Sequence, residues 1–232
     1  MKYLKKDFDF FLLSYPRSGS NWLRYCLEFL TKKPTVGPEN HTNPLNQPFG
    51  SRLELGVNLD QNYLLYRDHN LINTTLKVRN KPMIFLIRNY KECVLRGFCI
   101  SKNLNTSEAL RFAKEMLVVF ERNLRTFNDW SENKIVVYYE DLIINPEDTL
   151  KGILSFVGYS EEYLSDFLKN LEQHRVISLN EYSISQGRGT SGDKSTVNFY
   201  SKQFDKNVLR EIDKEFETIE FFSTHLERYK EI

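Results

Sequence analysis

The chain has 232 residues, of which 41% are hydrophobic and 14% aromatic, and its formal net charge is +1. This length suffices for one α/β domain with a sizeable core and argues against two full domains, so we expect a single domain over residues 1–232. The near-neutral charge excludes bulk electrostatic attraction to nucleic acid or to anionic membranes.

The sequence also bears on the compartment. No apolar run approaches the roughly 20 residues that a transmembrane helix needs, and charged residues between positions 5 and 9 interrupt any signal-like start. The cysteines lack metal-ligand spacing and indicate reduced thiols: Cys26, Cys93 and Cys99. We expect a cytoplasmic protein with no transmembrane segment and no metal, while sequons at Asn40, Asn73 and Asn105 leave a luminal location open.

The segment from Phe10 to Leu30 has the pattern of a strand, a polar turn and a helix. Residues 10–13 form a short apolar run typical of a buried parallel strand, and leucines recur at helical spacing from position 23. The turn between them, residues 16–21, supplies a cation, hydroxyls and a glycine. A turn of this kind directs backbone N–H groups and a helix N-terminus at one position, which favours a bound phosphate.

This turn resembles the 5'-phosphosulfate loop of sulfotransferases, which use 3'-phosphoadenosine-5'-phosphosulfate (PAPS) as donor. The family's loop usually reads Tyr-Pro-Lys-Ser-Gly-Thr-Thr-Trp, whereas this chain reads Tyr-Pro-Arg-Ser-Gly-Ser-Asn-Trp. The resemblance implies that the donor is bound by Arg17, Ser18, Gly19, Ser20, Asn21 and Trp22. The alternative is an ordinary strand-to-helix turn in which the tryptophan belongs to the core.

A second strand is predicted at Tyr63–Tyr66, and His69 follows its carboxyl end. Ligands of open parallel sheets gather at the carboxyl ends of strands, which favours chemistry for this histidine. Arg67-Asp68-His69 resembles the Lys-Thr-His that sulfotransferases often carry here, and this implies that His69 is the general base. An unperturbed histidine would titrate near pH 6.5. The alternative is a histidine that only forms hydrogen bonds in a loop.

A third buried strand, Pro82–Ile87, ends in Arg88. Residues 88–96 resemble the family's 3'-phosphate segment, Arg-Asn-Pro-Lys-Asp-Val-Ala-Val-Ser, with Arg96 in place of the serine. The resemblance implies that Arg88 binds the 3'-phosphate. Arg96 either joins it with a different geometry or belongs to a solvated helix face.

Two later segments complete the resemblance. A strand is predicted at Lys134–Tyr139, and its Tyr-Tyr-Glu-Asp-Leu run resembles the place where sulfotransferases put a tyrosine against adenine, which makes Tyr139 the candidate. The alternative is a core tyrosine. Residues 186–194 resemble the family's late basic glycine loop, so Arg188 and Gly189 are candidate 3'-phosphate contacts. The overlapping residues 187–195 nearly match a Walker A motif, but an aspartate is inserted before the lysine and no buried strand precedes these residues.

The rest of the chain is expected to be scaffold. We predict an irregular loop over Pro34–Gly50, amphipathic helices over Ser107–Phe127 and Glu161–Leu171, and a helical packing segment from Phe204 onward that extends to Ile219. We also predict a helix that begins with Asn145 as N-cap and Pro146 at N1 and that reaches Gly158.

The combined motifs predict a three-layer, P-loop-NTPase-like α/β fold with a central parallel sheet, of the sulfotransferase type. The resemblance implies sulfuryl transfer from PAPS to a hydroxyl or amine, with His69 and Arg17 as catalytic residues and 3',5'-ADP as product. The acceptor is expected to be a small molecule, a saccharide or a lipid, and the sequence leaves its identity and the oligomeric state open. Alternatives are a nucleotide or small-molecule kinase and a nucleotide-binding module without catalysis.

Overall fold

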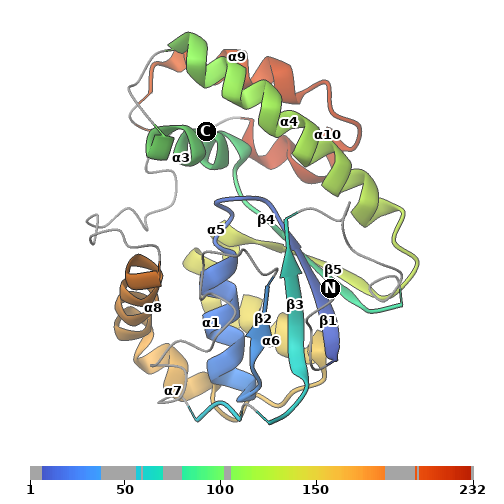
Figure 1. Ribbon diagram of the computed structural model, residues 1–232, viewed down its shortest axis with the longest axis vertical. Coiled ribbons are helices and arrows are strands. Elements are labelled where there is room, and N and C mark those ends of the chain that lie inside the picture. The colour runs from blue at the N-terminus through green and yellow to red at the C-terminus, as the bar shows by residue number, and fades with distance from the viewer. Residues whose placement is uncertain are drawn as a thin grey trace.

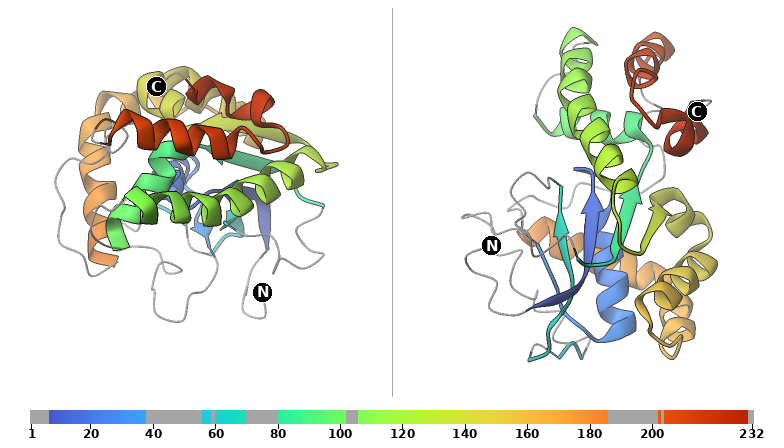
Figure 2. Two further views of the ribbon diagram at one scale, coloured as in Figure 1. Left: turned by 90° about the horizontal axis from the view of Figure 1, so that it is seen from above. Right: turned by 90° about the vertical axis from the view of Figure 1, so that its right-hand side faces the viewer.

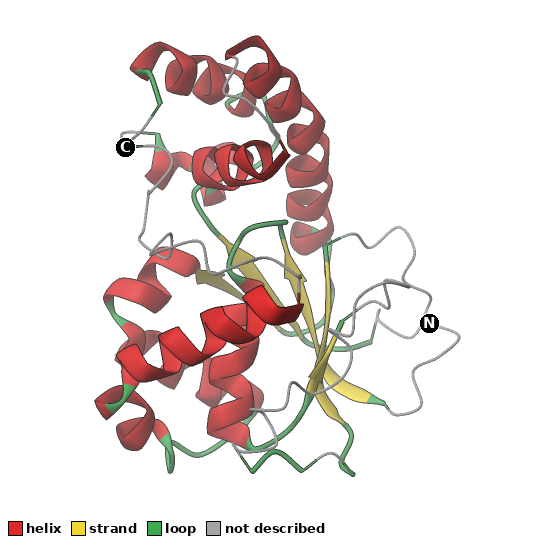
Figure 3. Ribbon diagram, turned by 60° about the vertical axis from the view of Figure 1, so that its left-hand side comes forward, coloured by secondary structure: helices red, strands yellow, loops and turns green. Residues whose placement is uncertain are grey.

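A five-stranded parallel sheet, with strand order β2-β3-β1-β4-β5, forms the centre of the molecule (Figure 3). The computed structural model describes residues 7–37, 56–58, 60–69, 80–101, 106–185, 202 and 204–230, and leaves out the side chains of residues 98–107 and 181–185. The strands are β1 (Phe8–Ser14), β2 (Thr35–Val36), β3 (Tyr63–Asp68), β4 (Met83–Ile87) and β5 (Lys134–Tyr138). Because neighbouring strands are parallel, the residues that follow β1, β3, β4 and β5 meet at one edge.

Alternate residues of the central strands enter two hydrophobic cores, one on each face of the sheet. In β4, Met83, Phe85 and Ile87 enter one core, whereas Ile84 and Leu86 enter the other. All five are fully buried, which explains why the strand is a continuous apolar run in the sequence.

Helices cover both faces, so the layers are helix, sheet and helix (Figure 1). The first core is closed by α3 (Tyr90–Ser101), α4 (Thr106–Asn128), α9 (Lys206–Phe216) and α10 (Phe222–His225). The second is closed by α1 (Ser20–Thr31), α6 (Pro146–Val157), α7 (Leu164–Lys169) and α8 (Leu171–Ser185). Two short elements complete the described chain, α5 (Tyr139–Ile144) and the 3-10 helix η3 (Glu227–Tyr229). Helices α4 and α9 run beside each other although they are far apart in the sequence (Figure 2).

Several predicted elements are confirmed. Helix α4 matches the helix expected over residues 107–127, and three residues of its apolar stripe, Ala113, Phe120 and Leu124, are fully buried. Asn145 and Pro146 occupy the N-cap and first turn of α6, and Gly158 ends that helix in the left-handed conformation. Within the described ranges, no helix has the length and apolar character needed to cross a membrane.

The predicted irregular loop at residues 34–50 is wrong at its start, because β2 lies there. Thr35 and Val36 pair with β3, and both are buried. Arg24 of α1 donates from Nε to the Thr35 hydroxyl at 2.7 Å, while the Thr35 amide donates to Glu28 Oε1 at 2.9 Å. These hydrogen bonds from α1 fix the position of β2. A strand of two residues is too short to show a hydrophobic pattern in the sequence. Residues 38–50 lie outside the described part of the chain.

Two helix boundaries also differ from the sequence prediction. The helix expected over residues 161–171 is two helices, because α7 stops at Lys169 and α8 begins at Leu171. The side chain of Asn170 donates to the Asp166 carbonyl at 3.0 Å, and this side-chain cap closes the end of α7. In the C-terminal segment the regular helix α9 ends at Phe216, and Ile219 lies beyond it in the same core.

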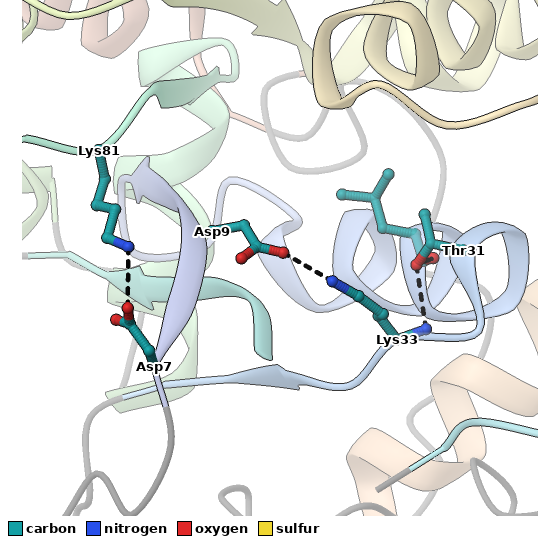
Figure 4. A network of polar contacts seen from close by, with 6 residues as sticks. Asp7, Asp9, Thr31, Lys33 and Lys81 are labelled. Carbon is teal, nitrogen blue, oxygen red and sulfur yellow. Dashed lines mark hydrogen bonds and ion pairs between the residues drawn. The ribbon is translucent and has the colours of Figure 1, made fainter. Parts of the chain in front are cut away.

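Ion pairs lie at the amino end of β1, the end away from the turn at residues 16–21 (Figure 4). Lys33 pairs with Asp9 at 2.9 Å, and Lys81 pairs with Asp7 at 3.2 Å. Such partly exposed pairs contribute little to stability, so the sheet depends chiefly on its two apolar cores.

Candidate functional site

The turn between β1 and α1 is an open N-terminus suited to an anion. Arg17 has φ 69° and Gly19 has φ 89°, so both adopt the left-handed conformation. Ser18 donates from its amide and its hydroxyl to the Tyr15 carbonyl, at 3.2 and 2.7 Å. The N-cap of α1 has no side-chain cap, and its first turn holds no acidic residue. The N–H groups and the helix dipole at this end can therefore act on an external anion.

Tyr139 packs directly on this turn and corrects one sequence prediction. It was expected to end strand β5, but that strand ends at Tyr138, and Tyr139 opens α5. A Cβ built on Gly19 would lie 2.3 Å from two carbons of the Tyr139 ring. Both the backbone conformation and the available space thus require glycine at position 19. Tyr139 is 5% exposed and belongs to the second core.

Arg88 joins the end of β4 to the same turn. Its Nη1 donates to the Arg17 carbonyl at 3.3 Å, and its guanidinium carbon lies 4.0 Å from the centroid of the Tyr139 ring. The side chain is 3% exposed, and Nε and Nη2 have no hydrogen-bond partner among the described residues. A buried guanidinium in this state carries unmet donors, which an anionic ligand would satisfy.

Arg96 lies beside Arg88 because both cations share one carboxylate. Glu92 is fully buried, and its Oε1 lies 2.7 Å from Arg96 Nε and 3.8 Å from Arg88 Nη2. Burial and the neighbouring Arg88 cation lower the pKa of Arg96. One carboxylate facing two guanidinium groups leaves a net positive charge at the start of α3.

His69 follows β3 and is held by the end of β1. Its Nδ1 lies 2.9 Å from the carbonyl oxygen of Ser14 and 3.1 Å from that residue's hydroxyl. A carbonyl can only accept, so Nδ1 carries the proton and Nε2 carries the lone pair. Burial, together with the nearby Arg67 and Arg17 cations, lowers the pKa of His69 to about 3. The imidazole is therefore neutral at physiological pH, and its pKa lies well below the 6.5 of an unperturbed histidine.

The remaining loop residues have mixed positions. Ser18 is fully buried and Ser20 is 8% exposed. Asn21 and Trp22 each keep a buried polar atom, Oδ1 and Nε1, that has no hydrogen-bond partner in the described part of the chain. Trp22 packs in the second core between Tyr25 and Phe167, with ring centroids 5.8 and 5.9 Å away. This matches the core alternative for its ring, and its contact with a nucleotide stays a prediction.

The structure brings together the candidates from four strand ends: Arg17, His69, Arg88, Arg96 and Tyr139. The predicted late loop contacts, Arg188 and Gly189, lie outside the described residues. Among the described residues, no three His, Cys, Asp or Glu side chains lie close enough to hold a metal ion.

Three residues at this site were given no role from the sequence. Ser14 orients His69, Asn123 donates from Nδ2 to the His69 carbonyl at 3.1 Å, and Glu140 accepts the Asn89 amide at 3.0 Å. The sequence held a signal for Asn123, a polar residue on the buried stripe of α4 three positions after Phe120. The contacts of Ser14 and Glu140 join distant segments, and no local pattern reports them.

Comparisons with known proteins agree with this geometry. A family model described as a sulfotransferase domain matches residues 7–230. The 3-alpha-hydroxysteroid sulfotransferase of Cavia porcellus is 25% identical over 176 residues, which cover 68% of this chain and 61% of that protein. The match thus spans about three fifths of that relative's length.

Two solved structures share the fold. Mouse sulfotransferase SULT7A1 complexed with PAP aligns with TM-score 0.57 and 18% identity, over 92% of this chain and 84% of that chain. Retinol dehydratase in complex with androsterone and inactive cofactor PAP aligns with TM-score 0.65 and 13% identity, over 97% of this chain and 83% of that chain. They confirm the predicted α/β fold with a central parallel sheet.

Proposed function

We propose that this chain, which belongs to the sulfotransferase family, transfers a sulfuryl group from PAPS to a hydroxyl or amine of a small-molecule acceptor. Because the match covers only part of the relatives' length, the activity, the donor and the acceptor are all part of the proposal. A cytosolic location belongs to it too, and the free thiols of Cys26 and Cys93 support that location.

The buried Arg88 is the observation that carries this proposal. Its Nη1 contacts the turn that opens α1, and its Nε and Nη2 have no hydrogen-bond partner among the described residues. A guanidinium and an uncapped helix N-terminus thus lie at the same edge of the sheet. PAPS carries phosphate oxygens on its 5' and 3' sides, and a ligand with two anionic groups fits two such elements. Arg88 and Arg96 would hold the 3'-phosphate, and residues 17–22 would hold the 5' side. The PAP in both related structures, which is 3',5'-ADP, supports this choice of nucleotide.

His69 would act as the general base. Because Nδ1 donates to Ser14, Nε2 is the nitrogen able to take the acceptor's proton. The acceptor oxygen then forms a bond to sulfur while the bond from sulfur to the phosphate oxygen breaks, and the departing nucleotide keeps that electron pair. The donor, when bound, supplies a sulfuryl group that is already activated by its bond to phosphate.

Arg17 would offset the charge that grows on the departing phosphate. It lies in the turn itself, close enough to His69 to lower the pKa of that imidazole. An arginine is always protonated, so Arg17 can stabilise the charge but cannot donate a proton. The proposal needs no metal ion.

Nucleotide binding tests this function. We expect 3',5'-ADP to raise the melting temperature far more than 5'-AMP or magnesium ATP, since only 3',5'-ADP fills both phosphate positions. A ligand at 100 times its Kd adds about 2.7 kcal/mol of stability. Strong stabilisation by magnesium ATP without a comparable effect of 3',5'-ADP would instead favour the kinase.

An Arg88→Gln variant locates the 3'-phosphate in the same experiment. It should weaken 3',5'-ADP by roughly 1.5–3 kcal/mol, and adenosine-5'-phosphosulfate, which lacks the 3'-phosphate, by much less. Arg210→Gln, an exposed change on α9, is the control and should leave both affinities unchanged. Equal losses for the two ligands would exclude a specific 3'-phosphate role for Arg88.

A further inference from the structure

Helix α4 brings two consecutive polar residues, Arg122 and Asn123, to the end of β3 where His69 lies. Asn123 is fully buried, and its Nδ2 donates to the His69 carbonyl at 3.1 Å. Its Oδ1 is a buried acceptor with no hydrogen-bond donor among the described residues. The nitrogen of the Asn123 side-chain amide thus has a hydrogen-bond partner, whereas its oxygen has none among the described residues.

Arg122 supplies the opposite kind of group. Its Nε and Nη2 are buried and have no acceptor in the described part of the chain, although the side chain as a whole is only half-buried. The nearby Asp68 carboxylate attracts this guanidinium. Native proteins rarely leave buried donors unpaired, and such groups commonly mark the place of a ligand or an ordered water.

Among the described residues, several cations act at this end of the sheet. Arg67 and Arg17 act on the imidazole, and Arg122 lies close enough to Asp68 for the two charges to interact. An anionic group on the acceptor would be attracted to this end of the sheet.

We propose that the acceptor is a polar, anionic hydroxy compound, such as a sugar acid or a phenolic acid, whose carboxylate binds Arg122 beside His69. This inference rests on the proposed function and specifies its acceptor class. Asn123 Oδ1 accepts a hydroxyl of the same molecule. A steroid alcohol in this place would exclude water and leave both residues unpaired, and a site built for hydrogen bonds discriminates strongly against a ligand that lacks the matching groups.

Matched pairs of probes test the charge requirement. Calorimetric titrations compare 4-hydroxybenzoate with its methyl ester, and glucuronate with its methyl ester, on the full chain saturated with 3',5'-ADP. We expect at least one acid to bind about tenfold or more tightly than its ester, the range of a charge-assisted hydrogen bond. In sulfate-transfer assays with labelled donor, the same acid should have the higher kcat/KM.

Two arginine variants decide whether Arg122 is responsible. Arg122→Gln should abolish the preference for the acid, whereas Arg125→Gln should preserve it, because Arg125 is exposed on the same helix and pairs with Glu121 and Glu220. Ester binding should be equal in all three proteins, which shows that each is folded. The inference is overturned if neither acid is preferred over its ester, if the preference survives in Arg122→Gln, or if androsterone binds in place of both acids.

The nucleotide separates this inference from the proposed function. Arg122→Gln should keep the wild-type stabilisation by 3',5'-ADP, since the donor phosphates are assigned to other residues. If 3',5'-ADP binds and the acids show no preference, only the acceptor inference fails. If 3',5'-ADP does not bind, the proposed function fails, and the same acid and ester titrations on the nucleotide-free protein still decide whether Arg122 holds an anion.

Discussion

At the scale of single residues, the tautomer of His69 determines what it can do. The hydrogen bond from Nδ1 to the Ser14 carbonyl fixes the proton on that nitrogen, and the Asn123 bond holds the backbone carbonyl of the same residue. Both contacts come from elements of the first core, so the imidazole is oriented before any ligand arrives. Preorganisation of this kind is what a general base needs.

Replacing His69 with Asn should therefore reduce turnover without affecting the donor. We expect the rate of sulfate transfer to fall by about two to four orders of magnitude, while the affinity for 3',5'-ADP stays near the wild-type value. A labelled-donor assay and a thermal-shift titration measure the two quantities. A variant that retains more than about a tenth of the wild-type rate would remove His69 from the mechanism.

The pH profile offers a second test of the same residue. The base works when neutral, and a pKa lowered to about 3 keeps it neutral throughout the neutral range. The value of kcat/KM should therefore change little between about pH 5.5 and 7.5, whereas an unperturbed histidine would raise it about tenfold over this interval. A tenfold rise that disappears in His69→Asn would show that the imidazole titrates normally.

At the scale of elements, the turn, β4 and α5 form one packed unit around Gly19. Gly19→Ala should destabilise the protein, because alanine disfavours φ 89° and its Cβ would overlap the Tyr139 ring. We expect a loss of roughly 2–4 kcal/mol in the free energy of unfolding, measured by urea denaturation. Gly152→Ala, in the interior of α6 with open space around it, is the control and should be neutral or stabilising by up to about 1 kcal/mol.

A second change separates the two causes. Adding Tyr139→Ala to Gly19→Ala should remove the overlap but not the backbone strain, so the double variant should lose less than the sum of the two single changes. Strict additivity would mean that the ring does not constrain position 19.

The elements also show where sequence patterns succeed. Strands β1, β3 and β4 were predicted because each is a continuous apolar run, and each delivers a site residue at its carboxyl end. The patterns failed where apolar residues continue past the end of one element into the next, so that the boundary between the two elements cannot be seen in the sequence. The apolar run of β5 continues into α5, and the leucines of α7 and α8 keep helical spacing across Asn170.

At the scale of the whole molecule, the C-terminal segment is bonded to the site through a buried polar network. Lys91 is fully buried, and its Nζ donates to Asp213 at 2.8 Å and to the Tyr229 carbonyl at 2.6 Å. The Tyr229 hydroxyl donates to Glu140 at 2.7 Å, and Glu140 in turn holds the amide of Asn89. Residues 213 and 229 thus support the start of α3, directly after Arg88.

No sequence pattern could have predicted this network. The family resemblance aligned Lys91 with the 3'-phosphate segment, but its partners are more than 120 residues away in the chain. The end of a strand can be predicted from the residues next to it in the sequence. The partner of a buried charge depends instead on which distant segment packs against it in the folded protein. The chemistry of the turn was therefore predictable, and the residues that fix its position were not.

Removing Asp213, the carboxylate partner of Lys91, should show how much the stability of the fold depends on this buried pair. Asp213→Ala leaves the buried ammonium with the Tyr229 carbonyl as its one acceptor among the described residues, and it also removes the acceptor of the Tyr90 hydroxyl. We expect the free energy of unfolding to fall by about 3 kcal/mol. Lys91→Met in the same chain should restore much of the loss, because it removes the buried charge. Lys214→Ala breaks the exposed pair with Glu211 and should cost less than about 1 kcal/mol. Urea denaturation of the four proteins measures these values, and a double variant no more stable than Asp213→Ala would show that the buried ammonium is not the source of the loss.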